Sequence, residues 1–290
     1  MNLNVWHLQV FVRVYECMSM SVAAEELFIT QPAVSRIIRE LEDGYGTRFF
    51  LRQSGRLYRT EGGKRFYPHA RLVIEAAEQL ECAVRDQKLR MKVHIGATPT
   101  AGTYYLPAAL SRYRDAGGEL DLYLHTGPTS QLEEMLRNAQ LDFAVMEEMR
   151  STQELLVRPL LEEQMVFITD APVSVPNPMP LLIMDLGERD RQRLEQALYQ
   201  AGIPYVIKGL FADVEGVKRC AARGFGVGII PAGTIRPGEP YQRLEIPQVA
   251  PTRRFFLVHH RKKFLFPQLR QLIGTLESHL NPSRETEEAP

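Results

Sequence analysis

Cysteine is scarce in this sequence. Only three occur among 290 residues, Cys17, Cys82 and Cys220, and no two of them form a Cys-x-x-Cys pair. Sparse, widely spaced cysteines argue against a zinc site and a disulfide framework, and they are typical of a reducing compartment. We therefore expect a cytoplasmic protein that needs neither a metal nor a cofactor.

Long apolar runs and catalytic signatures are also missing. No apolar stretch approaches the roughly 20 residues of a membrane span, and the first residues, MNLNVWHLQVF, lack the cationic start of a signal peptide. The seven histidines form no His-Glu-x-x-His pattern, and neither a phosphate-binding loop nor a Gly-x-Gly-x-x-Gly motif opens a helix. We therefore expect a soluble protein that is not an enzyme and does not contact a membrane.

Net charge is absent too, because 35 lysines and arginines balance 35 acidic residues. The balance is uneven along the chain, however, and the distribution of charge matters more than its sum for nucleic-acid binding. Between residues 48 and 65 the single acid is Glu61. The cations of that stretch are Arg48, Arg52, Arg56, Arg59, Lys64 and Arg65.

The stretch Ser21–Glu42, SVAAEELFITQPAVSRIIRELE, predicts two short helices with a tight break between them. Thr30 is expected to cap the second helix, and Pro32 falls in its first turn, where a missing N–H costs little. At about 100° per residue, one face of this helix is apolar and the opposite face carries small polar groups and two arginines. The apolar residues are Val34, Ile37, Ile38 and Leu41, and the opposite face holds Pro32, Ser35, Arg36 and Arg39.

Such a helix suits the major groove of DNA, where small groups meet base edges and cations meet phosphates. An ordinary amphipathic helix pair in a protein core is the alternative. The residues that follow favour DNA: Gly44 and Gly46 are expected to break the helix, and two short strands flank a turn at Gln53–Gly55. This hairpin wing carries Arg52 and Arg56 near its tip, within reach of phosphates, unless it is only a solvated surface hairpin.

A long helix is predicted from about Thr60 to Lys88. Its apolar residues recur at spacings of four and three, a heptad pattern that favours pairing with the same helix of a second copy. Packing against its own chain is the alternative. The seam consists of Phe66, Ala70, Val73, Ala77, Leu80 and Val84.

From Met91 onward, strand and helix patterns alternate, which predicts an α/β region with parallel sheets. The expected strands include Lys92–Ala97, Leu141–Met146, Gln164–Thr169 and Arg254–His259, and the expected helices include Tyr105–Ala116 and Pro267–Leu280.

The run AAEELFITQPAVSRIIRELE, followed by FFLR and TEGG, resembles the DNA-binding segment of the LysR-type bacterial transcriptional regulators, and TQPAVSR is its most specific part. The segments GATPTAGTYYLP, LDFAVMEE and VKRCAARGFGVGIIP follow in the order of the same family. The resemblance covers about residues 3–280. It implies an N-terminal winged helix-turn-helix and a long linker helix, then a two-lobed α/β effector domain like that of periplasmic binding proteins.

On this chain the resemblance implies a DNA-binding domain at 1–60, a linker and dimerisation helix at 61–89, an effector-binding domain at 90–282 and a disordered tail at 283–290. Lobe I would span about 92–163 and 262–280, and lobe II about 164–260. The implied function is sequence-specific regulation of transcription by a homodimer or homotetramer on double-stranded promoter DNA. A small polar, anionic metabolite between the lobes would modulate it.

The family motif places the following residues on the DNA side: Thr30, Gln31, Pro32, Ala33, Ser35, Arg36 and Arg39, with Arg52 and Arg56 from the wing. The sequence departs from the family pattern in three places. Met18-Ser19-Met20 replaces a usual Gly-Ser-Phe turn, Val22 stands where a basic residue often follows that turn, and Arg59 stands where an apolar residue normally precedes the threonine. The role of Arg59 is therefore open at this point.

In the effector domain, hydroxyl groups gather where a strand ends and a helix begins, a position at which free N–H groups favour an anion. Thr98 and Thr100 are the first choices for effector binding, although each hydroxyl could simply cap a helix. Further candidates follow the ends of other strands, where open α/β sheets bind ligands. They are Thr129, Ser130, Glu147, Asp185, Gly187 and Pro231.

Three other functions could use parts of the same pattern. A solute-binding protein would share the two lobes, but it needs export and leaves the first 88 residues unexplained. An enzyme on the same fold would need a nucleophile, base and acid that the motifs do not supply. A DNA-binding regulator that uses its second domain only for oligomerisation, without an inducer, stays open.

Overall fold

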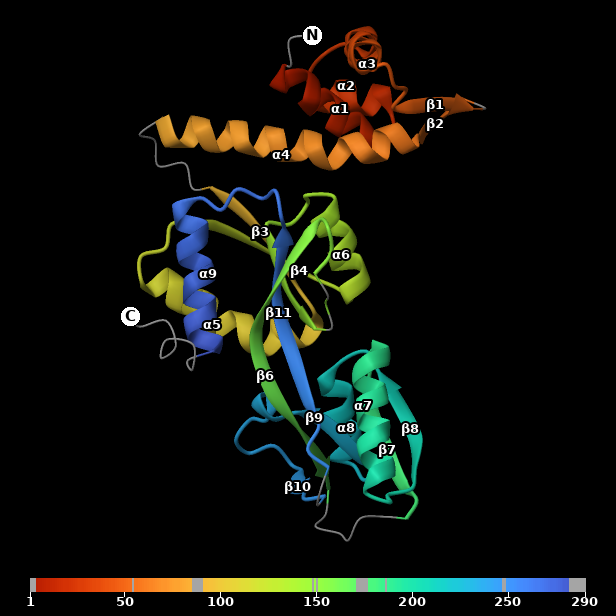
Figure 1. Ribbon diagram of the computed structural model, residues 1–290, viewed down its shortest axis with the longest axis vertical. Coiled ribbons are helices and arrows are strands. Elements are labelled where there is room, and N and C mark those ends of the chain that lie inside the picture. Colours follow the sequence, from red (N-terminus) through yellow and green to blue (C-terminus); the bar gives the residue numbers. More distant parts are fainter. Residues whose placement is uncertain are drawn as a thin grey trace.

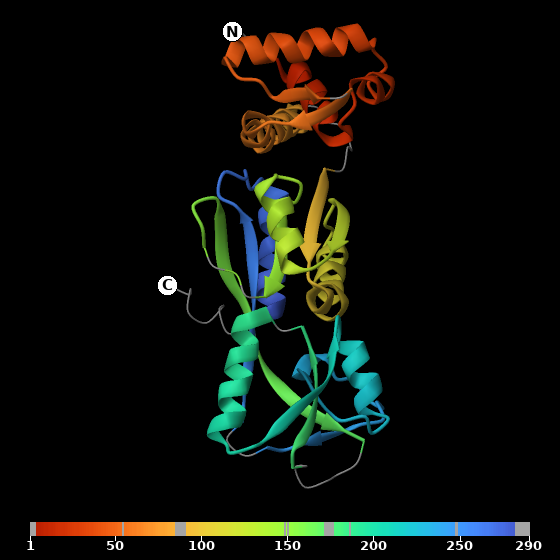
Figure 2. The same ribbon diagram turned by 90° about the vertical axis from the view of Figure 1, so that its right-hand side faces the viewer.

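The computed structural model describes residues 4–53, 55–84, 91–147, 149, 151–170, 177–185, 187–246 and 249–281. A helical N-terminal domain lies at one end of the molecule, lobe II lies at the opposite end, and lobe I lies between them (Figures 1 and 2). No described helix combines the length and apolar character needed to cross a membrane. The tail expected at 283–290 lies outside the described residues.

Three helices begin the N-terminal domain: α1 (Val5–Cys17), α2 (Met20–Glu26) and α3 (Gln31–Tyr45). Each begins after a polar residue, Asn4, Ser19 or Thr30, whose side chain accepts a backbone N–H of the first turn. The cap predicted at Thr30 is confirmed, with its Oγ1 3.4 Å from the amide nitrogen of Ala33.

Two helices of this domain end at a residue with a left-handed backbone conformation. Gly46 ends α3 at φ 62°, whereas Gly44 lies inside the helix, so the expectation that both glycines break it was wrong. Met18 ends α1 at φ 53°, at the position where the family pattern has glycine. A side chain is strained in this conformation, which costs roughly 1 kcal/mol or more, so the departure from the family pattern is tolerated at a local cost.

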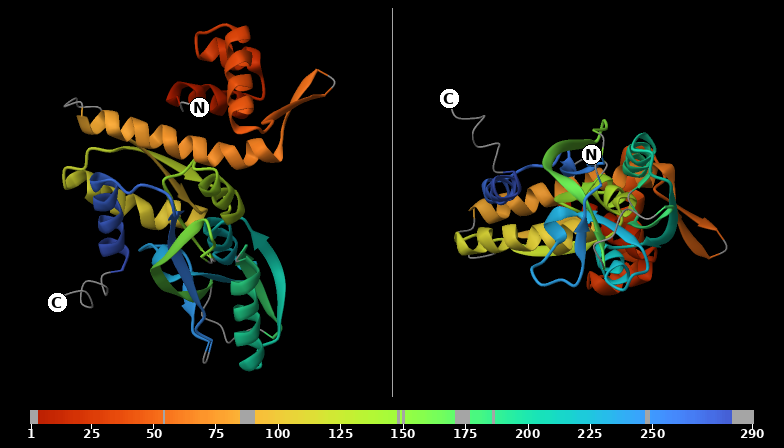
Figure 3. Two further views of the ribbon diagram at one scale, coloured as in Figure 1. Left: turned by 45° about the horizontal axis from the view of Figure 1, so that its top comes forward. Right: turned by 90° about the horizontal axis from the view of Figure 1, so that it is seen from below.

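The wing consists of β1 (Phe50–Gln53) and β2 (Arg56–Arg59), which pair antiparallel with Gln53 opposite Arg56. It projects away from the helices, beyond the end of α4 (Glu61–Val84) (Figure 3). Aromatic rings fix its base: the ring centroids of Phe11 and Phe49 lie 5.1 Å apart, edge to face, and those of Phe49 and Phe66 lie 4.5 Å apart, stacked.

The first half of α4 is part of this N-terminal core. Ala70 is fully buried there, and Phe66 packs against the same cluster. These two members of the predicted heptad seam therefore pack within their own chain, which was the alternative for that helix. Val73 and Leu80 are exposed and Ala77 is half-buried, while the side chain of Val84 lies outside the described set.

A single mixed sheet of nine strands carries both lobes, in the order β4-β3-β5-β11-β6-β9-β7-β8, with β10 also on β6. The prediction of purely parallel sheets was wrong, because β11 runs antiparallel to both β5 and β6. The strands are β3 (Lys92–Ala97), β4 (Asp121–Thr126), β5 (Phe143–Glu147), β6 (Leu155–Thr169), β7 (Met179–Met184), β8 (Tyr205–Phe211), β9 (Val227–Pro231), β10 (Gln242–Leu244) and β11 (Thr252–His260).

Strands β6 and β11 run through both lobes (Figure 1). They pair from Leu155 opposite His260 to Gln164 opposite Thr252, and β6 then pairs with β9 from Met165 onward. The strand expected at Gln164–Thr169 therefore begins nine residues earlier than predicted, at Leu155. The pairing partner lies far away in the sequence, so local patterning did not reveal this extension.

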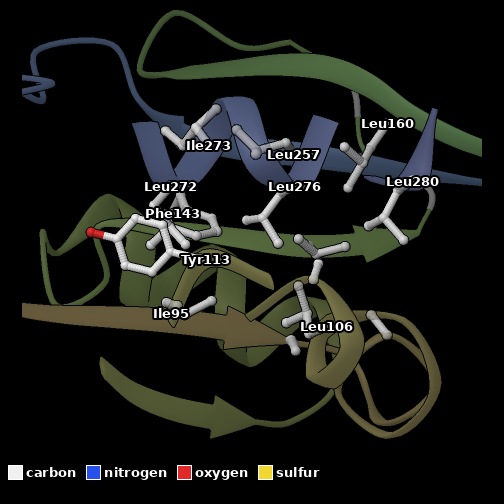
Figure 4. Packing of buried hydrophobic residues seen from close by; sticks show 14 of the residues in the cluster. Ile95, Leu106, Tyr113, Phe143, Leu160, Leu257, Leu272, Ile273, Leu276 and Leu280 are labelled. Atoms are coloured by element: carbon white, nitrogen blue, oxygen red, sulfur yellow. The ribbon is translucent and has the colours of Figure 1, made fainter. Parts of the chain in front are cut away.

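Helices cover the sheet in both lobes. They are η1 (Ala101–Tyr105, a π-helical turn), α5 (Leu106–Asp115), α6 (Thr129–Arg137), α7 (Gly187–Gln200), α8 (Val214–Ala221), η2 (Ala232–Thr234, a 3-10 turn) and α9 (Pro267–Leu280). Figure 4 shows Leu272 and Leu276 of α9 facing Phe143 and Leu257 of the sheet in lobe I. A second core, around Leu182, Leu198 and Ile229, fills lobe II.

Glu42 connects α3 to the wing. Its carboxylate is buried, accepts the backbone N–H groups of Phe49 (2.7 Å) and Phe50 (3.2 Å), and accepts the Arg48 guanidinium (2.7 Å). The sequence does not reveal this role of Glu42, because an acid near the end of a helix normally indicates exposure.

We predict that Glu42→Ala destabilises the N-terminal domain by about 3 kcal/mol, since two buried N–H groups lose their acceptor. Trp6, in α1, is the single tryptophan, so its fluorescence during urea unfolding reports on this domain. Glu40→Ala is the matched control, because Glu40 is exposed and only 3.8 Å from Arg36, a pair worth under about 1 kcal/mol. Equal losses in the two variants would contradict the role of Glu42.

Candidate DNA-binding and interlobe sites

The outer face of α3 carries the residues that the sequence placed on the DNA side. Val34, Ile37 and Ile38 face the core with at most 6% of their surface exposed. On the opposite side Pro32, Arg36 and Arg39 are exposed, and Gln31, Ala33 and Ser35 are half-buried. The Arg36 side chain is 74% exposed, so α3 presents small polar groups and cations to solvent.

A hollow of about 240 Å³ separates α3 from the wing and brings residues of both elements together. Ser35 and Arg39 line it from α3, and Arg52 lines it from β1. Arg48 joins them from the loop between α3 and the wing, and only one carboxylate, Glu42, lies among the lining residues. The hollow is therefore cationic, and Arg48 is a member that the sequence analysis counted among the cations but did not assign to the DNA side.

The three arginines of the wing strands differ in role. Arg52 is exposed, and its Nη2 lies 3.0 Å from the Met20 sulfur, while Arg56 is exposed near the tip. Arg59 instead donates two hydrogen bonds to the carbonyl of Tyr15, at 3.2 and 2.9 Å, and its guanidinium lies 4.5 Å from the centre of the Tyr15 ring. Arg59 therefore fastens the wing to α1, which accounts for its place in an apolar position of the family pattern.

Thr98 and Thr100 lie where lobe I faces lobe II. Both are about 5% exposed or less, and the Thr98 N–H donates to the carbonyl of Val145, two residues before Glu147. The ends of β3 and β5 are thereby adjacent. The buried hydroxyl of Thr98 has no hydrogen-bond partner among the described residues, which is unusual because buried polar groups are normally paired.

Arg253 of β11 connects the lobes at this point. It is 5% exposed, its Nη2 lies 3.2 Å from the Glu147 carboxylate of lobe I, and its Nε lies 3.8 Å from the Asp190 carboxylate in the first turn of α7. A buried cation requires such partners, because loss of one leaves an uncompensated charge. Glu147, predicted to contact an effector, is therefore occupied in part by a charge pair of the protein.

Two adjacent tyrosines of η1 extend the contact between the lobes. The Tyr105 hydroxyl donates to Glu163 of β6, which also accepts the N–H of Gly233 in η2. The Tyr104 hydroxyl donates to Glu215 of α8, and the buried Lys218 ammonium lies 5.0 Å from the centre of the Tyr104 ring. Burial and the Glu215 carboxylate raise the pKa of Tyr104 above its usual range.

The other predicted effector residues are distributed over several parts of the two lobes. Asp185 and Gly187 line a hollow of about 350 Å³ in lobe II, with Arg191 and Leu210 on its other sides. The Pro231 carbonyl accepts the hydroxyl of Thr234, and Thr129 and Ser130 are partly exposed at the start of α6. Asp185 and Gly187 therefore belong to a separate surface of lobe II, and the residues predicted to bind the effector do not form a single site.

Arg253, Glu163 and the tyrosine pair were not among the predicted site residues. A signal for Arg253 was present, because it alternates with Phe255 and Leu257 on the buried face of a strand. Glu163 had no such signal, since its burial depends on η2 and η1, which lie far away in the sequence.

Known protein families match both the N-terminal and the C-terminal part of the chain. A family model described as "Bacterial regulatory helix-turn-helix protein, lysR family" matches residues 5–64, and "LysR substrate binding domain" matches residues 86–281. A probable hydrogen peroxide-inducible genes activator of Mycobacterium avium is 27% identical over 285 residues, covering 93% of this chain and 92% of its own length. The transcriptional regulator YeiE of Escherichia coli K12, described as uncharacterized, is 24% identical and covers 94% and 97%.

Solved structures share the fold. ArgP from Mycobacterium tuberculosis superposes with a TM-score of 0.77 at 17% identity, covering 97% of this chain and 98% of that one. A full-length OxyR variant from Pseudomonas aeruginosa gives a TM-score of 0.69 at 20% identity, covering 96% and 98%. Both agree with a winged helix-turn-helix joined to a two-lobed effector domain.

These matches define the chain as a helix-turn-helix transcription regulator with an effector-binding domain. It belongs to the LysR family of bacterial regulators, whose two family models together take in most of its length. The predicted family, fold class and regulatory function are confirmed, and its relatives are transcription regulators, not enzymes.

The shifted pKa of Glu163 predicts how the stability of the effector domain depends on pH. Burial raises the pKa of Glu163, although the Gly233 N–H and the Arg253 charge partly oppose this. The folded protein thus holds this proton more tightly than the unfolded chain, and the resulting stability is lost as pH rises through the pKa of the folded state. Glu163→Gln stays neutral, and its amide can still donate to the Tyr105 oxygen and accept the Gly233 N–H.

We therefore expect Glu163→Gln to raise the free energy of unfolding above that of the wild type at pH 8, with the gain shrinking toward pH 5. Urea unfolding followed by circular dichroism at the two pH values measures it. Glu162→Gln is the control of opposite sign, because Arg254 lowers the pKa of the exposed Glu162. A destabilised Glu163→Gln protein at pH 8 would contradict the assignment.

Proposed function

We propose that this regulator reads promoter DNA with the outer face of α3 and holds the flanking phosphates with its wing. The bases would be met by Gln31, Pro32 and Ser35, and the backbone by the cations of α3 and the wing. The observation that carries this proposal is the cationic hollow lined by Ser35, Arg39, Arg48 and Arg52, which has the recognition helix on one side and the wing on the other. Phosphate contacts position a protein on DNA, and base contacts give specificity.

We also propose that the protein acts as a homodimer or homotetramer. The part of the heptad seam that the N-terminal core leaves free, Val73, Ala77 and Leu80, stays available on the second half of α4, and 66% of Leu80 is exposed. Pairing of these residues between two copies would place two recognition helices on one site with dyad symmetry.

The effector is proposed to be a small polar metabolite that binds where the lobes meet, with Thr98 and Thr100 as contacts. Support comes from the buried Thr98 hydroxyl, which has no partner among the described residues, and from its place at the start of a helix that presents N–H groups. A ligand that favours one arrangement of the lobes would shift the population of DNA-bound states.

The name of the M. avium relative refers to induction by hydrogen peroxide. In this chain the two cysteines whose side chains are described, Cys17 and Cys220, lie in α1 and α8 and belong to separate cores. A disulfide between these two within one chain cannot form in this arrangement, because Cys17 packs against the N-terminal core and Cys220 against the core of lobe II, so we favour a bound metabolite over oxidation of that pair.

Arg36→Ala is predicted to weaken DNA binding at least about tenfold, the effect of losing a contact worth about 1–3 kcal/mol. A gel shift with the DNA upstream of the protein's own gene measures this, and size-exclusion chromatography checks that oligomerisation is retained. Arg219→Ala is the matched control, because Arg219 is exposed on lobe II. Unchanged binding by Arg36→Ala would remove α3 from the interface.

Thr98→Val is predicted to weaken effector binding about fivefold, equivalent to roughly 1 kcal/mol for one hydrogen bond. The thermal stability of the free protein should stay the same or rise, because the buried hydroxyl has no described partner to lose. Calorimetry with a metabolite panel measures the binding, and Thr275→Val, at a partly exposed position of α9, is the control. A destabilised variant with unchanged binding would assign Thr98 a structural role only.

A further inference from the structure

A stripe of polar side chains on α4 faces lobe I. Tyr67, Arg71 and Glu75 are spaced four residues apart, so they lie on one face of the helix. Helix α4 crosses the end of lobe I (Figures 1 and 3). The Gln140 amide donates to the Tyr67 hydroxyl at 3.4 Å, and Arg71 Nε donates to the Ala139 carbonyl at 3.0 Å. The stripe therefore joins the N-terminal domain to the loop between α6 and β5.

Lys263 is the centre of this junction. It follows β11, its side chain is only 4% exposed, and its ammonium pairs with Glu75 of α4 and with Asp142 of lobe I. The second Asp142 oxygen accepts the N–H of His94 at 2.6 Å. Two carboxylates from different domains thus share one buried cation, and a buried charge that loses its partner destabilises the contact strongly.

The same stripe continues into the helix-turn-helix. Arg71 Nη1 lies 3.1 Å from Glu16 of α1, and the Tyr67 hydroxyl donates to the same carboxylate at 2.7 Å. Tyr67 is 1% exposed and stacks on Tyr15, with ring centroids 4.1 Å apart. A shift of α4 relative to lobe I would therefore be transmitted to α1 and to the core that supports α3.

The junction has the character of a separable contact. A hollow of about 280 Å³ lies between the two domains, lined by Arg13 and Arg71 on one side and by Lys92 and His94 on the other. Ala139 adopts a left-handed conformation (φ 52°), which costs a side-chain-bearing residue energy and presents its carbonyl to Arg71. Polar and incompletely filled interfaces of this kind permit relative domain motion.

We propose that Lys263, through Glu75, is the positioning residue that sets the orientation of the DNA-binding domain on lobe I. The pair fixes α4 in one pose, and a change in the effector domain reaches the recognition helices by strengthening or breaking it. Neither residue touches DNA in this scheme. The proposal depends on the DNA-binding role of the family and not on any particular effector.

Glu75→Gln is the first test, because Glu75 is 27% exposed and Lys263 keeps Asp142 within lobe I, so the variant should fold. Lys263→Met removes the shared cation, and Lys263→Arg retains it. Glu81→Gln, at an exposed position of α4, and Lys262→Met, at an exposed position beside Lys263, are matched controls. All variants are made in the full-length protein.

Two readouts separate positioning from folding. Small-angle scattering of the free protein should show a larger radius of gyration for Glu75→Gln and Lys263→Met, with Lys263→Arg and both controls like the wild type. On DNA upstream of the protein's own gene, affinity for the full site should fall about five- to tenfold, while affinity for one half-site stays within about twofold. The electrophoretic bend angle of the DNA should change in parallel.

Unchanged scattering in both Glu75→Gln and Lys263→Met would overturn the proposal. So would an equal loss of affinity for the full site and the half-site, because that pattern indicates general destabilisation. If Lys263→Met fails to fold, Glu75→Gln alone decides. Failure of the wild type to bind this DNA would count against the proposed operator, and the scattering result would still test the junction.

Discussion

One helix has to satisfy two domains at once, and the rest of the molecule is arranged around that constraint. The first half of α4 buries Tyr67 and Ala70 in the N-terminal core. The side chains one and two turns further along, Arg71 and Glu75, contact lobe I. Because a helix is stiff over this length, the orientation of α3 follows from how α4 lies on lobe I. Val73 and Leu80 stay exposed on the outer surface of α4, where the proposed second copy would pair.

The second constraint is the shared pair of strands β6 and β11. They belong to both lobes, so the lobes are joined by a hydrogen-bonded ladder and not by flexible linkers. Arg253 lies on this ladder, between Glu147 of lobe I and Asp190 of lobe II. A ligand that competes for one of these carboxylates changes the balance of charge at the point where the lobes meet. The other end of β11 leads directly to Lys263, which connects the two constraints.

Many elements of this molecule could be predicted from its sequence, because they depend on local chemistry. The N-cap at Thr30 and the apolar face of α3 depend on local chemistry, and β3 and α9 have the bounds that their patterns predict. The features that the sequence did not predict depend on partners that lie far away in the sequence. The early start of β6 requires β11, the burial of Glu42 requires the wing, and the charges of Lys263 and Arg253 are compensated by residues more than 60 positions away. The seam of α4 could not reveal which of its residues the chain itself would cover.

Hydroxyl-radical footprinting of the full-length protein on DNA upstream of its own gene tests the central arrangement most directly. A dimer with two recognition helices should protect two segments on one face of the duplex, related by a dyad, with centres one or more turns of about 10.5 base pairs apart. A single protected segment without a symmetric partner would contradict the pairing of two copies through α4.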